Sequence, residues 1–250
     1  MRPTTALLVG IGLAACLSRG AEAQSLYGPG GLVLHPAATV PPKGQLTPAV
    51  LLLPQHVRFP GAIKTRTWIS GSLDYGLTDD VEIGVTTLNI TEWPIPETSV
   101  GGYAKWRFLR ESGGRPAAAA GFTMTGFGGT NTRQAFLAVR KHLVGRDGGK
   151  RPSAHPVTLN AGMLYDSIRD GIPRDDVLPY AGLEIGLARR LTAIAEGRPP
   201  GTGDLGTPVA VSLAYQYSRA GRLVVTWANN GMSSSPRFGV GVGLGIGAQR

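Results

Sequence analysis

The sequence has a single cysteine, Cys16, which lies in the apolar run at the N-terminus. Because the rest of the chain has no thiol, neither a disulfide framework nor a cysteine-ligated metal site can form there. Charge is also scarce, since only 16% of the residues are charged. Beyond the N-terminus, no stretch of about 18 residues is both apolar and uncharged, which excludes a transmembrane helix in that part of the sequence.

Glycine, in contrast, is abundant, with 37 among 250 residues. Residues 238–247 read FGVGVGLGIG, so that an apolar residue and a glycine alternate. A period of two predicts a β-strand, because helical faces repeat near every 3.6 residues. Five glycines on one face of a strand indicate that another part of the chain approaches that face closely.

Alternation of this kind recurs in segments of about ten residues, which is the signature of a membrane barrel. Val81, Ile83 and Val85, for example, share one face, opposite Glu82 and Gly84. We therefore predict an all-β fold, a closed antiparallel transmembrane β-barrel of about twelve strands with its apolar faces toward lipid. Closure is required because an open edge in hydrocarbon leaves backbone groups unpaired. The predicted strands are residues 45–53, 66–76, 80–90, 99–109, 116–126, 132–142, 156–165, 179–188, 190–196, 207–217, 221–228 and 237–247.

The predicted connections alternate in length. Tight ones follow even-numbered strands and long ones follow odd-numbered strands, as expected when the N-terminus and the short turns are periplasmic. Residues 144–153 form a long connection after an even strand and break this rule. The tight connections are residues 77–80, 110–115, 188–190 and 218–221, and the long ones are residues 54–64, 90–97, 166–177, 197–206 and 229–236.

The N-terminus predicts export. Arg2 precedes the apolar residues 5–17, and residues 21–23 form an A-x-A cleavage site. Residues 13–16 also resemble a lipobox that would make Cys16 a lipidated N-terminus, so both alternatives stay open, with cleavage after Ala23 favoured.

Three regions follow from this interpretation: residues 1–23 are a signal peptide, 24–44 an N-terminal segment and 45–250 the barrel. The final strand is expected to close the barrel against residues 45–53. Its bare glycine face leaves space inside, so we expect residues 26–43 to lie in the lumen beside those glycines and to narrow it. The four tryptophans, Trp68, Trp93, Trp106 and Trp227, are candidates for the aromatic belt at the membrane interface or for internal packing.

Motifs for catalysis and cofactors are missing. Residues 145–150 read GRDGGK and lack the first glycine of a phosphate loop, and the glycine series at the C-terminus lacks the dinucleotide-binding spacing. We expect no cofactor, no metal and no enzymatic activity. Charged and polar positions on the inner faces are instead candidates for setting the charge of the lumen: Glu82, Lys105, Arg107, Asn160 and Glu184.

The formal net charge of +9 is compatible with nucleic acid, but an exported chain meets anionic lipid or polysaccharide first. The expected partners are therefore outer-membrane lipids, the barrel-assembly machinery, and polysaccharide or export proteins, with no nucleic acid.

A family resemblance covers about residues 27–125. Residues 27–39 read YGPGGLVLHPAAT and are followed by PPKG at 41–44, which resembles the opening of YjbH-like outer-membrane barrels associated with exopolysaccharide export. Residues 74–84, DYGLTDDVEIG, and 103–108, YAKWRF, are similar to a hairpin and the following strand in bacterial barrel proteins. The resemblance implies a membrane barrel near an envelope polysaccharide system, and it transfers no catalytic residue.

The sequence thus favours a bacterial outer-membrane barrel that acts as an envelope scaffold or narrow conduit. One alternative is an outer-membrane hydrolase acting on lipid or polysaccharide through His56, His142 or His155, although no serine stands at a family-like spacing from any of them. The other alternative is a soluble periplasmic barrel or sandwich with its apolar residues inside.

Overall fold

The computed structural model describes residues 31–59, 62–90, 97–127, 131–144, 155–168, 174–218, 221–231 and 236–246. Among these residues, no helix is long and apolar enough to cross a membrane. The described chain forms twelve strands, at the places where alternation predicted them. They are β1 (Leu46–Phe59), β2 (Ala62–Gly76), β3 (Val81–Ile90), β4 (Glu97–Leu109), β5 (Ala117–Phe127), β6 (Thr132–Val144), β7 (Val157–Ile168), β8 (Arg174–Ala188), β9 (Leu191–Gly197), β10 (Val209–Gln216), β11 (Gly221–Asn229) and β12 (Arg237–Leu244).

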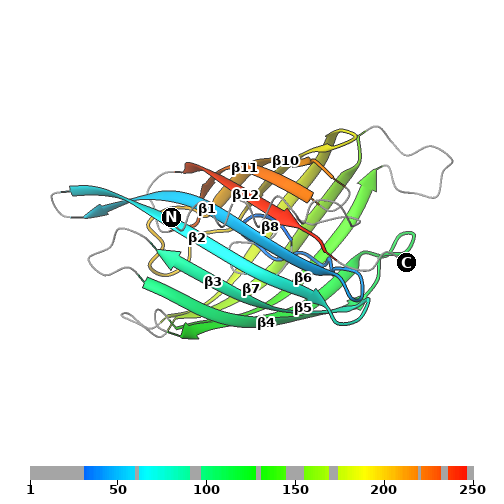
Figure 1. The fold of residues 1–250 in the computed structure, drawn as a ribbon, viewed down its shortest axis with the longest axis horizontal. Helices are drawn as coiled ribbons and strands as arrows, with labels where there is room; N and C mark the ends of the chain where they lie inside the picture. Colours follow the sequence, from blue (N-terminus) through cyan, green and yellow to red (C-terminus); the bar gives the residue numbers. More distant parts are fainter. Residues whose placement is uncertain are drawn as a thin grey trace, which may run out of the picture.

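The sheet closes into a barrel (Figure 1). Each strand pairs antiparallel with its neighbours in the chain, and β12 returns to β1, where Ala49 lies opposite Gly243 and Leu52 opposite Val240. Both the closed antiparallel barrel and the closing role of the last strand are therefore confirmed. A closed sheet leaves no unpaired edge around its circumference.

The two faces of the wall meet different surroundings. On β10, Val211 and Leu213 are 54% and 49% exposed on the outside, whereas Ser212 and Ala214 are 2% and 3% exposed on the inside. The predicted orientation, with apolar faces outward, is confirmed. The soluble alternative with apolar faces turned inward is wrong, because a large continuous apolar exterior is stable only against lipid or another apolar partner.

The tryptophans divide between the two faces. Trp106 and Trp227 are exposed on the outer face, as expected of interface residues. Trp68 points into the barrel and is only 5% exposed, so it belongs to the internal packing. Trp93 lies outside the described residues.

Two predicted long connections are wrong in their bounds. Residues 166–177 include the ends of β7 and β8, where Asp166 pairs with Asp176 and Ile168 with Arg174. Residues 54–64 were expected to form a long link, but β1 continues to Phe59 and β2 begins at Ala62, with these two residues paired. Among the described residues, the pairing of β1 with β12 ends at Leu52, and the far part of β1 has no described strand partner on that side. A proline such as Pro54 is tolerated on an edge strand. The β1–β2 hairpin consequently extends beyond the neighbouring strands (Figure 1).

Glycine has a defined packing role on the inner face. Three inward glycines lie directly opposite an inward aromatic residue of the next strand, and a methyl group at each glycine would overlap the aromatic ring. This arrangement places large rings inside a narrow barrel without widening it. The pairs are Gly84 with Tyr103, Gly121 with Phe136, and Gly162 with Tyr180.

The glycines of β12 are covered first by side chains of the neighbouring strand β1. The side chains nearest to Gly239 and Gly241 on the inner face are Leu53 and Leu51 of β1. Leu32, Val33 and Leu34 of the described part of residues 26–43 belong to the same apolar cluster as these two leucines. The leucines of the adjacent strand pack against the inner face of β12, where the glycines have no side chains.

Replacing Gly162 with alanine is expected to destabilise the barrel by about 1–3 kcal/mol, since the added methyl group would overlap the Tyr180 ring and force it to move. Gly102 gives a matched control, because an added methyl group there meets its nearest atom at an ordinary 3.6 Å. Urea unfolding of both variants in lipid vesicles measures the difference. Equal losses of stability at Gly162 and Gly102 would show that the position of the Tyr180 ring does not require a glycine opposite it.

Candidate functional site

Residues 31–40, here called the inner segment, lie inside the ring of strands (Figure 1, dark blue). All residues from 32 to 40 are buried, and they contact side chains that face inward from the wall. The chain then passes toward β1 across Gly76, where the backbone carbonyl of Pro42 approaches so closely that any Cβ would overlap it. Glycine is required there for the chain to leave the lumen.

Glu196, near the end of β9, fixes the inner segment to the wall. Its Oε1 accepts hydrogen bonds from the backbone N–H of Val33 (2.6 Å) and Leu34 (3.0 Å). Its Oε2 accepts from the N–H of His35 (3.1 Å) and lies 2.8 Å from Nδ1 of the same residue. The carboxylate is fully buried, so these four contacts replace the water that a charged group needs.

Strand β8 holds the other side of the same turn. The Tyr180 ring stacks on His35, with ring centroids 4.9 Å apart and planes inclined by 10°. Its hydroxyl donates a hydrogen bond of 2.9 Å to the carbonyl of Pro36. Leu32 packs directly over Gly182, which has no side chain to block it. The inner segment is therefore held by charge, stacking and apolar contact together.

Two apolar clusters surround this anchor. In the larger, the leucines and the valine of the inner segment pack on inward residues of the wall: Leu32, Val33, Leu34, Leu51, Leu53, Trp68, Ile194, Ala210, Ala214, Val224 and Ala228. In the smaller, Ala38 packs on the opposite side of the lumen against Ala117, Ala119, Phe136, Ala138, Leu164 and Tyr180. The inner segment thus bridges the lumen from one wall to the other.

Two of the candidate lumen residues form a buried ion pair. Glu82 and Lys105 lie opposite each other on β3 and β4, with Nζ 2.7 Å from Oε2 and both side chains fully buried. Tyr103 donates a hydrogen bond of 2.9 Å to the second oxygen of Glu82. Nearby, the Ser72 hydroxyl donates to Asp74 at 2.6 Å. The charges compensate each other rather than facing an open channel.

The remaining candidates lie nearer the rim that carries the short turns. Asn160 donates to Glu184 at 2.8 Å, and Arg140 lies 3.5 Å from the same carboxylate. Arg107 binds Asp80 in the turn between β2 and β3, through Nε at 3.1 Å and Nη2 at 3.0 Å. Cys16 lies outside the described residues.

Asp80 is expected to make stability dependent on acid. Hydrogen bonds from Arg110 and then Arg107 hold the pKa of Asp80 below its usual value, although desolvation opposes them. Because the folded pKa is the lower one, this stabilisation is present at neutral pH and is lost as the pH falls through the folded pKa. Asp80→Asn should lower stability by less than about 1 kcal/mol at neutral pH, since the pair is exposed. In urea unfolding, this difference should shrink as the pH falls below the ordinary range of a carboxyl group, because Asp80 then becomes protonated in the folded state too. A difference that does not change with pH would contradict the assignment.

The histidines proposed for a hydrolase are paired with other groups. His142 Nδ1 lies 2.5 Å from Glu111, and His155 Nδ1 lies 3.0 Å from the carbonyl of Gly186. The side chain of His56 lies outside the described residues. In the parts of the chain that the structure describes, no group of three histidine, cysteine or acidic side chains could hold a metal ion.

Closed barrels of this design are already known among solved structures. The chain has the fold of outer-membrane barrels. It superposes on the KdgM porin with a TM-score of 0.53 and 12% identity, over 80% of this chain and 98% of the porin, and gives the same TM-score with the porin in complex with disordered oligogalacturonate, at 13% identity. An outer membrane channel from Pseudomonas putida F1 gives a TM-score of 0.50 and 14% identity, over 86% and 99% of the two chains. No family model and no curated protein matches the sequence.

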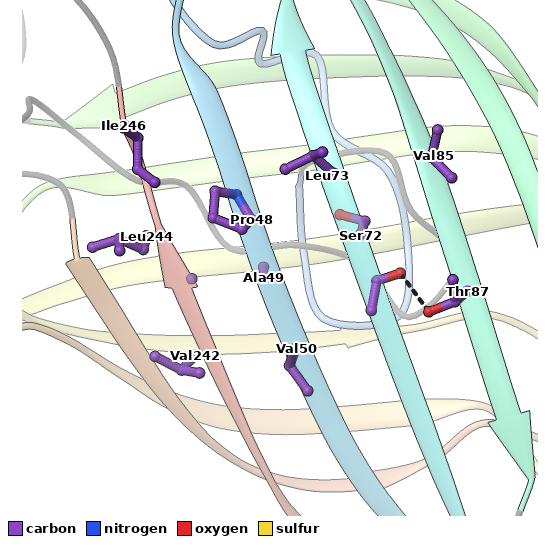
Figure 2. Close-up of a pocket in the computed structure, with 12 residues that line it drawn as sticks. Pro48, Ala49, Val50, Ser72, Leu73, Val85, Thr87, Val242, Leu244 and Ile246 are labelled. Carbon is purple, nitrogen blue, oxygen red and sulfur yellow. Dashed lines mark hydrogen bonds between the residues drawn. The ribbon is translucent and has the colours of Figure 1, made fainter. Parts of the chain in front are cut away.

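Two hollows help to locate the site. The larger, of about 590 Å³, lies on the outer surface over β12, β1, β2 and β3 (Figure 2). It is lined by apolar residues such as Val50, Leu73 and Val242, and its one threonine, Thr87, donates to the carbonyl of Gly71. The smaller, beside His35 in the lumen, is about 10 Å³, which is about the size of one water. This small hollow beside His35 therefore has space for no more than about one water.

The anchor residues were not among the sequence candidates. Glu196 ends a predicted strand and has the same inward position as Glu184, which was selected, yet nothing in the local sequence separates the two. The alternation of β9 could have identified it as inward. Its partners, the N–H groups of residues 33–35, lie about 160 positions away and carry no side-chain signature.

Proposed function

We propose that the protein is a bacterial outer-membrane barrel that acts as a conduit, with its lumen narrowed by the inner segment. The observation that carries this proposal is the hydrogen-bonded contact between Glu196 and residues 33–35 inside a barrel with an apolar exterior. An apolar outer face suits lipid, and an inner segment that bridges the lumen suits control of passage. Its fold, shared with porins and channels, supports the same function.

The solute we propose is a polysaccharide, with exopolysaccharide export as the setting. Two independent points support this: the resemblance of residues 27–125 to YjbH-like barrels, and the oligogalacturonate bound by the KdgM porin. The positive net charge of the chain favours an acidic polymer. Deleting the gene in its host is expected to lower the amount of secreted acidic polysaccharide. Unchanged secretion would contradict a role in exopolysaccharide export, but it would not contradict the proposal that the barrel is a conduit.

Planar-bilayer conductance tests the conduit. The native chain is compared with a variant in which residues 31–40 are replaced by a glycine–serine linker of equal length, which keeps the connection to β1 but removes the contacts with the wall. The native chain should give small currents and the linker variant clearly larger steps. A linker variant that folds, shown by heat-dependent gel mobility, but carries no current would leave only the scaffold.

The membrane location makes a separate prediction about the outer face. Leu213→Arg, in the middle of β10, should cost about 2–4 kcal/mol in a bilayer, whereas Leu187→Arg, close to the β8–β9 turn, should cost about 0–1 kcal/mol. Both leucines are exposed on the outside of the barrel. Unfolding in lipid vesicles measures the two costs, and equal costs at the two depths would argue against insertion.

A further inference from the structure

The wall opposite the smaller cluster carries many apolar side chains over several strands, which is unusual for a lumen that faces water. Inward apolar residues from β1, β2, β9, β10 and β11 pack together with Leu32, Val33 and Leu34 of the inner segment. Those three side chains are between 1% and 4% exposed. Ser212 and Thr226, which lie among the wall residues on β10 and β11, satisfy each other by a hydrogen bond of 2.8 Å. If the inner segment leaves, this surface is exposed to the lumen, and water wets it poorly.

Polar atoms without partners are embedded in the same surface. The indole N–H of Trp68 and the Oε1 of Gln55 are buried, and neither has a hydrogen-bond partner among the described residues. Leu53 of β1 pairs with Trp68 of β2, so Gln55 lies on the same face close by. A buried donor and a buried acceptor that remain unused in a native wall are costly. A ligand with one acceptor group and one donor group would satisfy them.

Glu196 adds a third requirement for such a ligand, because its carboxylate needs hydrogen-bond donors. With the inner segment in place, its carboxylate receives three backbone N–H groups and the His35 ring. With the inner segment gone, the same oxygens need other donors. A carboxylate ligand is disfavoured at this position, because two negative charges would meet in an apolar environment.

We propose that the lumen contains a binding site for an apolar molecule that carries N–H or O–H donors, and that residues 32–35 occupy this site in its place. The inner segment presents what such a ligand would present: apolar side chains toward the wall and N–H groups toward Glu196. The inference rests on the proposed function, because the inner segment must be able to leave the lumen. It adds a second class of ligand to the polysaccharide proposed above.

The test uses N-phenyl-1-naphthylamine, an apolar amine that fluoresces in apolar surroundings and accepts energy from tryptophan. Native chain and linker variant are placed in lipid nanodiscs, and saturable energy transfer to the probe is measured. Lipid-dissolved probe gives a linear background, which empty nanodiscs define. The linker variant is expected to bind at least about tenfold more tightly than the native chain, a factor that decides between an occupied and a vacant site.

Two tryptophan variants of the linker protein locate the probe. Trp68→Phe keeps an apolar ring but removes the nearest indole, so it should lower the saturable transfer strongly and weaken binding. Trp227→Phe, on the outer face, should lower the saturable transfer much less and leave the affinity for the probe unchanged. Saturable transfer that persists in Trp68→Phe and disappears in Trp227→Phe would place the probe outside and overturn the site.

Conductance of the same samples separates the two proposals. Larger currents from the linker variant without saturable probe binding would overturn the binding site and leave the conduit intact. Saturable binding that depends on Trp68, without any current, would support the site and overturn the conduit. A native chain that binds as tightly as the linker variant would overturn the claim that residues 32–35 occupy the site.

Discussion

Replacing Glu196 with alanine should release the inner segment from the wall while leaving the barrel closed. The substitution removes every acceptor for the N–H groups of Val33, Leu34 and His35, and for the ring of His35. A hydrogen bond to a charged group contributes about 1.5–3 kcal/mol to stability. Losing several of them costs more free energy than residues 33–35 can regain by rearranging. The twelve-strand ladder does not involve this side chain, and its closure should persist.

Two measurements detect the release of the inner segment. Amide hydrogen exchange at residues 33–35 should accelerate by about 100-fold or more, since each 1.4 kcal/mol corresponds to a factor of ten. Single-channel currents should rise toward those of the linker variant. Glu196→Gln should give an intermediate effect, because an amide keeps one acceptor oxygen but turns an N–H₂ group toward other donors.

Glu184→Ala is the matched control for both measurements. Glu184 also points inward, one strand away, but its partners Asn160 and Arg140 belong to the wall. Its loss should change neither the exchange at residues 33–35 nor the current by a comparable factor. Equal effects from the two substitutions would mean that the inner segment responds to general loosening of the barrel rather than to its anchor.

Much of the fold could be predicted from the sequence, because alternation has a direct physical cause. Each strand of a membrane barrel separates two solvents, so residues such as Leu213 and Ser212 must differ in polarity at every step. The ends of strands were less certain. Pro54 and the residues after it suggested a connection, yet the extra length of β1 and β2 is held by their mutual pairing alone, which tolerates proline at an edge.

The site could not be predicted to the same extent. The side chains of Glu82, Glu184 and Glu196 all occupy inward positions, and no feature of the local sequence distinguishes their roles. The structure separates them through partners distant in the chain: Lys105 for the first, Asn160 and Arg140 for the second, and backbone N–H groups for the third. Backbone donors are identical in every residue, so no residue type marks the places where they will gather.

The largest loss of stability is expected from Lys105→Met. Both members of the Glu82–Lys105 pair are fully buried, so this substitution leaves a carboxylate in the interior without its cation. Breaking a buried pair by removing one partner costs about 3–5 kcal/mol. Arg107→Met on the same strand is the control, because its partner Asp80 is partly exposed and such pairs contribute at most about 1 kcal/mol.

The double variant Glu82→Gln with Lys105→Met distinguishes the effect of the unpaired charge on stability from the effect of side-chain packing around the ion pair. Because it removes both charges, most of the stability lost in Lys105→Met should return, and the amide oxygen introduced on β3 can still accept the hydrogen bond from the Tyr103 hydroxyl. Guanidinium unfolding in lipid vesicles, followed by gel mobility, gives the free energy for each member of the cycle. If the double variant is as unstable as Lys105→Met alone, the loss comes from the missing lysine side chain, and the unpaired charge of Glu82 is not its cause.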